Sequence, residues 1–115
     1  MSDRIAVVLC NLGGPDSLAA VRPFLFNLFS DPDIFRLPLA WLTPKPFASL
    51  IAWRRAPEAA HGYAAIGGKS PILDYTNAQA AALQQALAEA GKFDMHVCMR
   101  YWHPLTSEVV AMLKQ

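Results

Sequence analysis

Two short apolar runs, far apart in the sequence and separated by helical patterns, constrain the fold of this chain most. Residues 5–9 form a continuous apolar run rich in β-branched side chains, which is typical of a central parallel strand covered on both faces. Residues 93–101 form the second run, with Met95, Val97 and Met99 on one face. Because strands joined through helical crossovers pair in parallel, we predict an α/β fold with a doubly wound parallel sheet.

The first helical pattern follows a turn signal at residues 11–15. Asp16 or Ser17 can cap the helix. Pro23 fits only in a first turn, so the regular helix is predicted to begin near it and to close at residues 31–33. The residues at helical spacing that make its apolar face are Val21, Phe24, Leu25, Leu28 and Phe29.

Residues 34–53 are rich in large apolar side chains but are interrupted by prolines. Pro38, Pro44 and Pro46 argue against one long helix, so we predict short helical turns whose apolar faces are only partly covered. A separate helical stretch is expected around residues 58–65.

The second half of the chain carries its own start and stop signals for helices. Residues 76–79 have the form of a capping box and predict a helix that begins there and ends at Gly91. Thr106 or Ser107 is expected to cap a last helix that runs into Gln115. Since two strands are too few for a complete open sheet, we expect the chain to be the first part of a longer protein.

Composition limits the classes of function. The chain has 115 residues, of which 54% are apolar and only 17% charged, against about 25% charged in an average globular chain. The surplus of apolar side chains predicts a buried interface, a missing partner segment or an apolar ligand groove. The net charge of +1, without basic runs or zinc-finger spacing, argues against nucleic-acid binding.

Cys10 and Cys98 each lie in an apolar run, and their spacing makes neither a disulfide framework nor a metal motif. We predict buried free thiols in a reducing compartment. No signal-peptide pattern is visible, and no run reaches the roughly 20 apolar residues that span a bilayer. We therefore expect a cytoplasmic chain, with peripheral contact to the inner membrane as an open alternative.

Residues 63–72 combine two adjacent glycines with a lysine, a serine and a proline. The glycines let the backbone bend and let a ligand come close, while Pro71 biases Ser70 toward an extended conformation. With cationic side chains nearby, this loop is predicted to hold an anion. A nucleotide P-loop is rejected, because Tyr63 stands where that motif requires its first glycine.

Ligand contacts are also predicted at the carboxyl ends of the two strands, where open α/β sheets bind ligands. Asn11 and Leu12 follow the first strand, and Arg100 ends the second strand near the same rim. A packed aromatic corner at residues 100–103 is the alternative. The glycine pair at 13–14 lacks the Gly-x-Gly-x-x-Gly pattern of dinucleotide sites. The three histidines show no metal-ligand spacing with one another or with the cysteines.

Arg54 and Arg55 admit two interpretations. A bare arginine pair can be a solvated helix end, or a fork that holds carboxylates in bidentate fashion. The pair follows an aromatic, proline-broken segment, which favours the second reading. A groove with apolar walls and arginines at its edge suits a large, flat, apolar ligand that carries carboxylates.

Four segments, in this order, resemble the amino-terminal part of ferrochelatase: residues 5–17, 24–33, 63–72 and 99–104. The match is collinear and extends over nearly the whole chain. It implies two doubly wound, chelatase-like α/β domains around a porphyrin cleft, with residues 1–115 as an incomplete first domain and the second domain absent. The activity it implies is insertion of ferrous iron into protoporphyrin IX, or coproporphyrin III in some bacterial members. Iron is then a substrate, and no cofactor is expected in this chain.

The resemblance also places six residues at the porphyrin cleft: Leu12, Arg54, Arg55, Tyr63, Ser70 and Arg100. Leu12 resembles a position that packs against the macrocycle, and the two consecutive arginines match a pair near the cleft. The tyrosine and the serine match positions that contact the porphyrin or its propionates, and Arg100 matches a cleft arginine. Residues 34–53 resemble the lip over the cleft, which touches the membrane in several members. Gly62 departs from bacterial members that have arginine there.

The expected partners are the porphyrin and the remainder of the ferrochelatase chain. The family's metal-inserting histidine and its glutamate lie in later segments, and no residue here matches them. The chain alone is therefore expected to help bind and bend the ring, without the general base that takes up its protons. Two other readings stay open: a tetrapyrrole-binding module without chemistry, and a truncated product with no independent fold.

Overall fold

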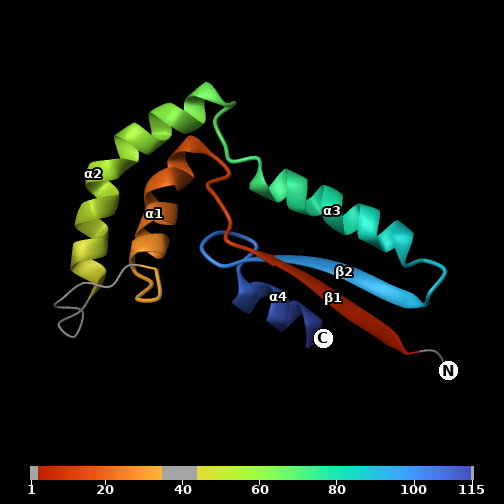
Figure 1. Ribbon diagram of the computed structural model, residues 1–115. Helices are drawn as coiled ribbons and strands as arrows, with labels where there is room; N and C mark the ends of the chain where they lie inside the picture. Colours follow the sequence, from red (N-terminus) through yellow and green to blue (C-terminus); the bar gives the residue numbers. More distant parts are fainter. Residues whose placement is uncertain (1–2, 35–43, 115) are drawn as a thin grey trace. The chain divides into compact units, whose positions relative to one another are not determined.

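The computed structural model describes residues 3–34 and 44–114, which form two compact units. Unit one comprises residues 1–13 and 71–115, and unit two comprises residues 14–70. The elements, in chain order (Figure 1), are β1 (Arg4–Asn11), the 3₁₀ helix η1 (Leu18–Ala20), α1 (Val21–Phe29), α2 (Pro44–Ala65), α3 (Ile72–Ala86), β2 (Lys92–Met99) and α4 (Thr106–Leu113).

Unit one is built on a parallel pair of strands, as predicted for an α/β fold. β1 and β2 run side by side with Arg4 opposite Lys92 at one end and Asn11 opposite Met99 at the other. Helices α3 and α4 both pack against β2, so this strand is the better covered of the two. Its last two residues, Cys98 and Met99, are buried, as are Tyr101 just beyond the strand and Val109 of α4.

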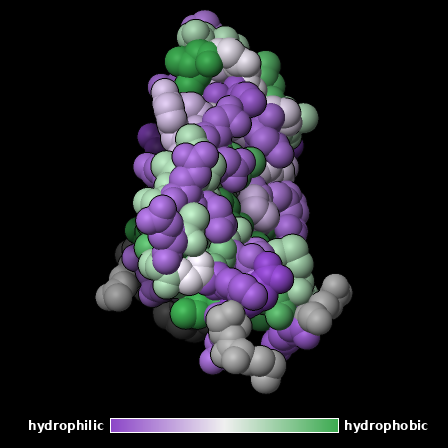
Figure 2. All heavy atoms as spheres, turned by 90° about the vertical axis from the view of Figure 1, so that its right-hand side faces the viewer, coloured by the Kyte–Doolittle hydropathy of each residue, from purple (hydrophilic) through white to green (hydrophobic). Residues whose placement is uncertain are grey.

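The expectation that residues 5–9 are covered on both faces is wrong for this chain. Ile5 is 50% exposed and Val8 is 38% exposed, although both belong to an apolar run. The reason is that α3 and α4 lie against β2, while β1 has few helix contacts of its own. The face shown in Figure 2 is mostly hydrophilic, with smaller hydrophobic areas between the polar residues. The surplus of apolar surface expected from composition is present.

Unit two is a pair of packed helices. Val21, Phe24 and Leu25 of α1 are buried against α2, where Ala48 and Ala52 are buried in turn. The start of α1 follows the prediction, since Pro23 lies in its first turn, where a missing N–H costs no helical hydrogen bond. Ser17 caps the preceding η1, because its Oγ accepts a 3.2 Å hydrogen bond from the backbone N–H of Ala20.

The prediction of short helical turns is wrong for residues 44–53. These residues and the stretch at 58–65 form one continuous helix, α2 (Pro44–Ala65). Pro44 and Pro46 lie in its first turn, where backbone N–H groups have no helical partner to lose. Pro57 lies inside the helix and removes one hydrogen bond without ending it. Pro38 lies outside the described residues.

Helix α3 begins earlier than the capping-box pattern predicts. It starts at Ile72 after Pro71, so Thr76 lies inside the helix rather than at its cap. The Thr76 hydroxyl donates a 2.6 Å hydrogen bond to the Ile72 carbonyl one turn back, which removes it from any capping role. The helix ends at Ala86, before Gly91, because the residues that follow form turns.

The predicted cap of the last helix is also wrong. Helix α4 starts at Thr106, with Leu105 as the residue before it. The backbone N–H of Leu105 donates a 3.2 Å hydrogen bond to Oε2 of Glu108, so the carboxylate of the first turn closes this helix start. Thr106 instead directs its hydroxyl toward the carbonyl of Met99, at 3.5 Å.

Candidate functional site

The two strands of unit one end at a common rim. Beyond the sheet, the N–H of Arg100 donates to the Asn11 carbonyl and the N–H of Tyr101 donates to the Leu12 carbonyl, both at 3.0 Å. The two segments therefore stay paired past the strands, as far as Leu12 after β1 and Tyr101 after β2. This pairing places Leu12 and Arg100 beside each other, as expected from sheet geometry.

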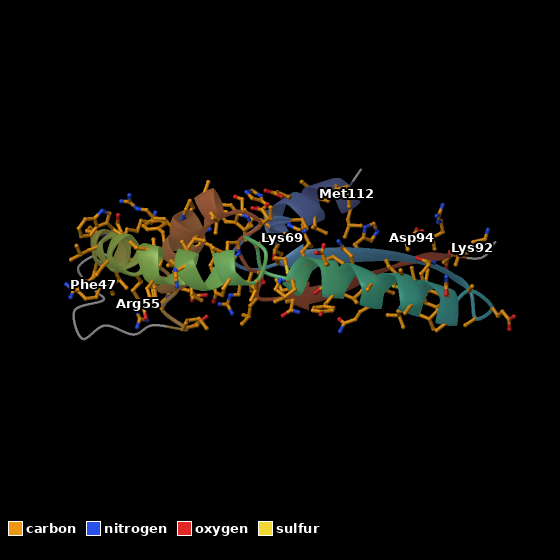
Figure 3. All side chains as sticks on the ribbon, turned by 90° about the horizontal axis from the view of Figure 1, so that it is seen from above. Phe47, Arg55, Lys69, Lys92, Asp94 and Met112 are labelled. Atoms are coloured by element: carbon orange, nitrogen blue, oxygen red, sulfur yellow. The ribbon has the colours of Figure 1, made fainter. Side chains whose placement is uncertain are left out.

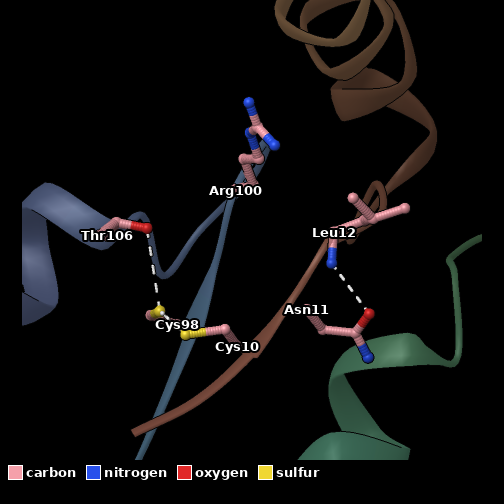
Figure 4. Close-up of a pocket in the computed structure, with 6 residues that line it drawn as sticks. All are labelled: Cys10, Asn11, Leu12, Cys98, Arg100 and Thr106. Atoms are coloured by element: carbon pink, nitrogen blue, oxygen red, sulfur yellow. Dashed lines mark hydrogen bonds between the residues drawn. The ribbon is translucent and has the colours of Figure 1, made fainter. Parts of the chain in front are cut away.

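A hollow of about 520 Å³ opens at this rim (Figure 4). Leu12 is exposed at its edge, and Arg100 contributes the guanidinium group among the lining side chains. The full lining is Cys10, Asn11, Leu12, Cys98, Arg100 and Thr106. The site thus combines an apolar side chain, a cation and a sulfur-rich wall within one hollow.

Hydrogen bonds of Asn11 hold this rim in place. Its Oδ1 accepts a 2.9 Å hydrogen bond from the N–H of Leu12 (Figure 4). Its Nδ2 donates at 3.4 Å to the hydroxyl of Thr76, which in turn donates to the Ile72 carbonyl. The end of β1 is therefore tied to α3 at Thr76. This positions the backbone of Leu12 without using the Leu12 side chain.

The turn under the rim also requires glycine at position 13. Gly13 has a φ of +91°, and a Cβ there would lie 3.0 Å from the Met99 Cβ and 3.3 Å from the Trp102 backbone nitrogen. A left-handed backbone and close packing meet at one residue. Backbone conformation and close packing thus both explain the glycine at position 13.

The alternative of an aromatic corner at residues 100–103 holds for part of that segment. Tyr101 is buried, and the Arg100 guanidinium lies 5.3 Å from its ring centroid, in cation–π geometry. Trp102 and His103 meet edge to face, with ring centroids 5.1 Å apart. His103 pairs with Glu108 through Nδ1 and Oε1. Packing thus fixes the residues around Arg100, while Arg100 itself remains exposed.

In unit two, Arg54 and Arg55 do not form one fork. Consecutive helical residues point about 100° apart, so the two side chains leave α2 in different directions. Arg55 lines a hollow of about 260 Å³ together with Leu25, Phe29, Glu58 and Ala59, and it extends away from the α2 ribbon in Figure 3. Arg54 is exposed on the side of α2 that carries Phe47 and Leu50.

The loop after Tyr63 bends as its glycines predict, but its backbone is already used. The N–H of Gly67 donates to the Ala64 carbonyl at 3.4 Å, and the N–H of Gly68 donates to the Tyr63 carbonyl at 2.7 Å. The Ser70 N–H donates to the Pro15 carbonyl at 2.8 Å. An anion at this loop therefore has to be held by side chains rather than by these three N–H groups.

The six positions expected at a cleft are thus divided between the units. Leu12 and Arg100 share one hollow in unit one. Unit two carries Arg54, Arg55 and the half-buried Tyr63 on α2, and Ser70 in the loop that follows.

Sequence reasoning missed one contact at the rim. Cys10 and Cys98 lie opposite each other in the strand register, and their Sγ atoms are 3.4 Å apart. Cys10 is exposed, so the prediction of two buried thiols is wrong for this residue. Hydrogen bonding with Cys98 raises the pKa of the Cys10 thiol, with smaller contributions from burial and charge repulsion. A parallel alignment of the two apolar runs in the sequence could have placed these two cysteines opposite each other.

The family model for ferrochelatase matches residues 4–115. The chain belongs to the ferrochelatase family. It is 54% identical to the ferrochelatase of Rippkaea orientalis over 114 residues, which cover 98% of this chain and 29% of that protein. It is 53% identical to the ferrochelatase of Synechocystis over 112 residues, covering 96% of this chain and 29% of the relative. It is 49% identical to the chloroplastic ferrochelatase-2 of Cucumis sativus, covering all of this chain and 23% of the relative.

Membership of the ferrochelatase family agrees with the parallel α/β unit and with the resemblance of the four motifs. The chain spans less than a third of the length of these relatives. In residues 3–34 and 44–114, no helix is both long and apolar enough to cross a membrane. The same residues contain no cluster of three histidine, cysteine or acidic side chains that could hold a metal.

Proposed function

We propose that this chain is the amino-terminal portion of a ferrochelatase, which inserts ferrous iron into protoporphyrin IX to form protoheme. In this proposal residues 1–115 supply part of the wall and lip of the porphyrin cleft, and the remainder of the protein supplies the metal-inserting groups. The observation that carries it is the shared hollow at the rim of β1 and β2. There Leu12 offers apolar contact and Arg100 offers a cation within one open site.

A porphyrin needs both kinds of contact. Its macrocycle is a large apolar surface, and burying apolar surface yields about 25 cal/mol per Å². Its propionates are carboxylates, which guanidinium groups bind through charge-assisted hydrogen bonds. Leu12 and Arg100 suit these two parts of the ligand. Arg54, Arg55, Tyr63 and Ser70 are proposed as further contacts from unit two.

The outer side of α2 supports the proposed lip. Phe47, Leu50 and Trp53 are 43%, 56% and 58% exposed, which is high for such large apolar side chains. They succeed one another at intervals of three residues, so they lie along one side of the helix. We propose that this stripe covers an apolar ligand or touches a membrane surface peripherally. We propose a cytoplasmic location, with peripheral contact to the inner membrane through this stripe.

Porphyrin titration of the purified chain, followed by absorbance, tests the proposal. We expect weak binding and no iron insertion by this chain alone, because the base that accepts the pyrrole protons lies in the family's later segments. Arg100→Ala is expected to weaken binding roughly 10- to 100-fold, the equivalent of one charge-assisted hydrogen bond. Arg4→Ala is the matched control, since Arg4 is exposed at the opposite end of β1, where it pairs with Asp94.

If the Arg100→Ala and Arg4→Ala variants bind porphyrin with equal affinity, the hollow is not part of the porphyrin site. Measurable metallation by the chain alone would contradict the assignment of the base to another segment. In a complete enzyme, Arg55→Ala is expected to weaken porphyrin binding; unchanged affinity would return Arg55 to the role of a solvated helix residue.

The second candidate function is a tetrapyrrole-binding module without chemistry. The open hollow with its apolar and cationic lining favours it as the alternative, since such a site can hold a porphyrin without a base. The downstream reading frame distinguishes the two functions. A continuation that carries a histidine and a glutamate supports the enzyme, and its absence supports the binding module.

A further inference from the structure

The two thiols of unit one form a preorganised pair. Cys10 of β1 and Cys98 of β2 occupy the same register position, and their Sγ atoms are 3.4 Å apart (Figure 4). The parallel pairing continues on both sides of them, from Arg4 to Asn11 along β1. Their separation is therefore set by the sheet, so that little conformational freedom is lost when a ligand bridges the two sulfurs.

The separation of the two sulfurs fits a single bridging cation. With a metal–sulfur bond of about 2.3 Å, the value for zinc thiolates, sulfurs 3.4 Å apart correspond to a sulfur–metal–sulfur angle of about 95°. A tetrahedral site needs a somewhat wider angle, which a small rotation of either side chain supplies. The pair can thus act as a bidentate ligand without any change in strand register.

The surroundings define what kind of cation can enter. Both sulfurs line the open hollow at the rim, and Cys10 is exposed to solvent there. The Thr106 hydroxyl lies 3.8 Å from Sγ of Cys98, so a polar group borders the sulfur pair. Among the described residues no histidine, carboxylate or further cysteine completes a set of three ligands. Water from the hollow would fill the remaining positions.

We propose that Cys10 and Cys98 form a dithiolate site for a thiophilic cation of the Zn²⁺ and Cd²⁺ class. Thiolates select such soft cations, whereas carboxylates, carbonyls and water suit Mg²⁺, Ca²⁺ and Mn²⁺. Binding breaks two S–H bonds, forms two metal–sulfur bonds and releases two protons to solvent. No electron is transferred, so the step needs neither an oxidant nor a reductant. The two sulfurs share the hollow that the proposed function gives to the porphyrin, but their binding of a cation takes no part in the proposed insertion of iron.

Cadmium titration of the 115-residue chain, kept reduced with a phosphine, tests this site. We expect one Cd²⁺ per chain, a sulfur-to-cadmium charge-transfer band in the ultraviolet and release of two protons per ion. Cys10→Ser and Cys98→Ser are each expected to lower the affinity by about 100-fold or more, because a one-point contact loses the effective concentration of the second thiolate. Circular dichroism checks that each variant keeps its helices and strands.

A relocated thiol provides the matched control. The double substitution Ala6→Cys with Cys10→Ala keeps two thiols in the chain but moves one of them four residues along β1, about 13 Å from its original place. This variant is expected to lose tight cadmium binding. Equal affinity in the relocated variant, or two cadmium ions bound independently to the original chain, would overturn the proposal.

Phenylarsine oxide supplies a second probe that ignores histidines and carboxylates. It condenses with two neighbouring thiols, forming two arsenic–sulfur bonds and one water molecule without any redox change. Mass spectrometry of the native chain is expected to show one such adduct, absent from both single serine variants and from the relocated variant. A native chain that forms no adduct, or a relocated variant that forms it as readily, would show that the two sulfurs cannot close on one ion.

Discussion

The backbone N–H of Gly68 donates a 2.7 Å hydrogen bond to the carbonyl oxygen of Tyr63 and thereby closes helix α2. Together with the bond from Gly67 to Ala64, this is the pattern of a Schellman motif, in which the first residue beyond the cap has a left-handed backbone. Gly67 has a φ of +106°, as that position requires. The glycine pair that marks this loop in the sequence is therefore first of all a helix terminator.

Gly67→Ala is expected to destabilise unit two by about 1–2 kcal/mol, the cost of a left-handed backbone for a residue with a Cβ. No atom lies within 4 Å of the added Cβ, so conformational strain is the whole effect. Urea unfolding followed by circular dichroism measures it. Gly62→Ala is the matched control, because Gly62 lies inside α2, also with open space around it, and alanine there should stabilise by about 0.5–1 kcal/mol. Equal effects of the two substitutions would contradict the motif.

Gly13→Ala is expected to cost more than Gly67→Ala. The left-handed backbone again costs about 1–2 kcal/mol. The added Cβ also meets the buried Met99 at 3.0 Å, and overpacking adds about 1–3 kcal/mol. The same urea experiment ranks the two variants. If the Gly13→Ala and Gly67→Ala proteins are equally stable, the backbone around position 13 shifts at little cost to make room for the added Cβ.

Thr76→Val tests the hydrogen bonds that tie β1 to α3. Thr76 is only 3% exposed, and its hydroxyl accepts from Asn11 while donating to the Ile72 carbonyl. Valine keeps the shape but leaves the Asn11 amide without this acceptor, so we expect a loss of about 1–2 kcal/mol. Thr76→Ser keeps the hydroxyl and serves as the control. A valine variant as stable as the original chain would show that the hydroxyl contributes nothing.

The sequence predicted the strands well because their signal is local and strong. The apolar runs at residues 5–9 and 93–101 each lie within an observed strand or extend just beyond it, and the rim that joins Leu12 to Arg100 follows from parallel pairing. The start of α1 near Pro23 was also correct. A run of β-branched apolar residues is typical of a strand, and a proline is compatible with a helix mainly in its first turn.

Helix boundaries were predicted less well, because several signals compete at each of them. Thr76 has the side chain of a capping residue, but Pro71 starts the helix one turn earlier and turns Thr76 into an interior hydrogen-bond donor. Pro46 can break a helix in its interior, yet it is harmless in the first turn of α2. Neither outcome can be read from the residue alone, since each depends on where the neighbouring turn begins.

The candidate site depends on contacts that no local pattern contains. The separation of Arg54 from Arg55 follows from the helix that carries them, once that helix is known to be continuous. The contact between Cys10 and Cys98 depends on the strand register, which a single run of apolar residues cannot specify. The residue types thus indicated a binding rim. The contact between its two sulfurs could be found only from the strand register.

The stability of unit one is expected to depend on pH through Cys10. Hydrogen bonding with Cys98 raises the pKa of Cys10, so folding favours the protonated thiol. The stability gained from this contact is present below the ordinary thiol pKa and is lost as the pH rises through the raised value. Cys98→Ala removes the partner, so at pH 7.5 maleimide should alkylate Cys10 faster, roughly three- to fourfold for each pKa unit lost, because the thiolate becomes more abundant but less nucleophilic. Peptide mass spectrometry follows Cys10 alone, and urea unfolding between pH 7 and 10 should show a weaker alkaline loss in the variant. Equal alkylation rates of Cys10 in the two proteins would mean that Cys98 does not hold its proton.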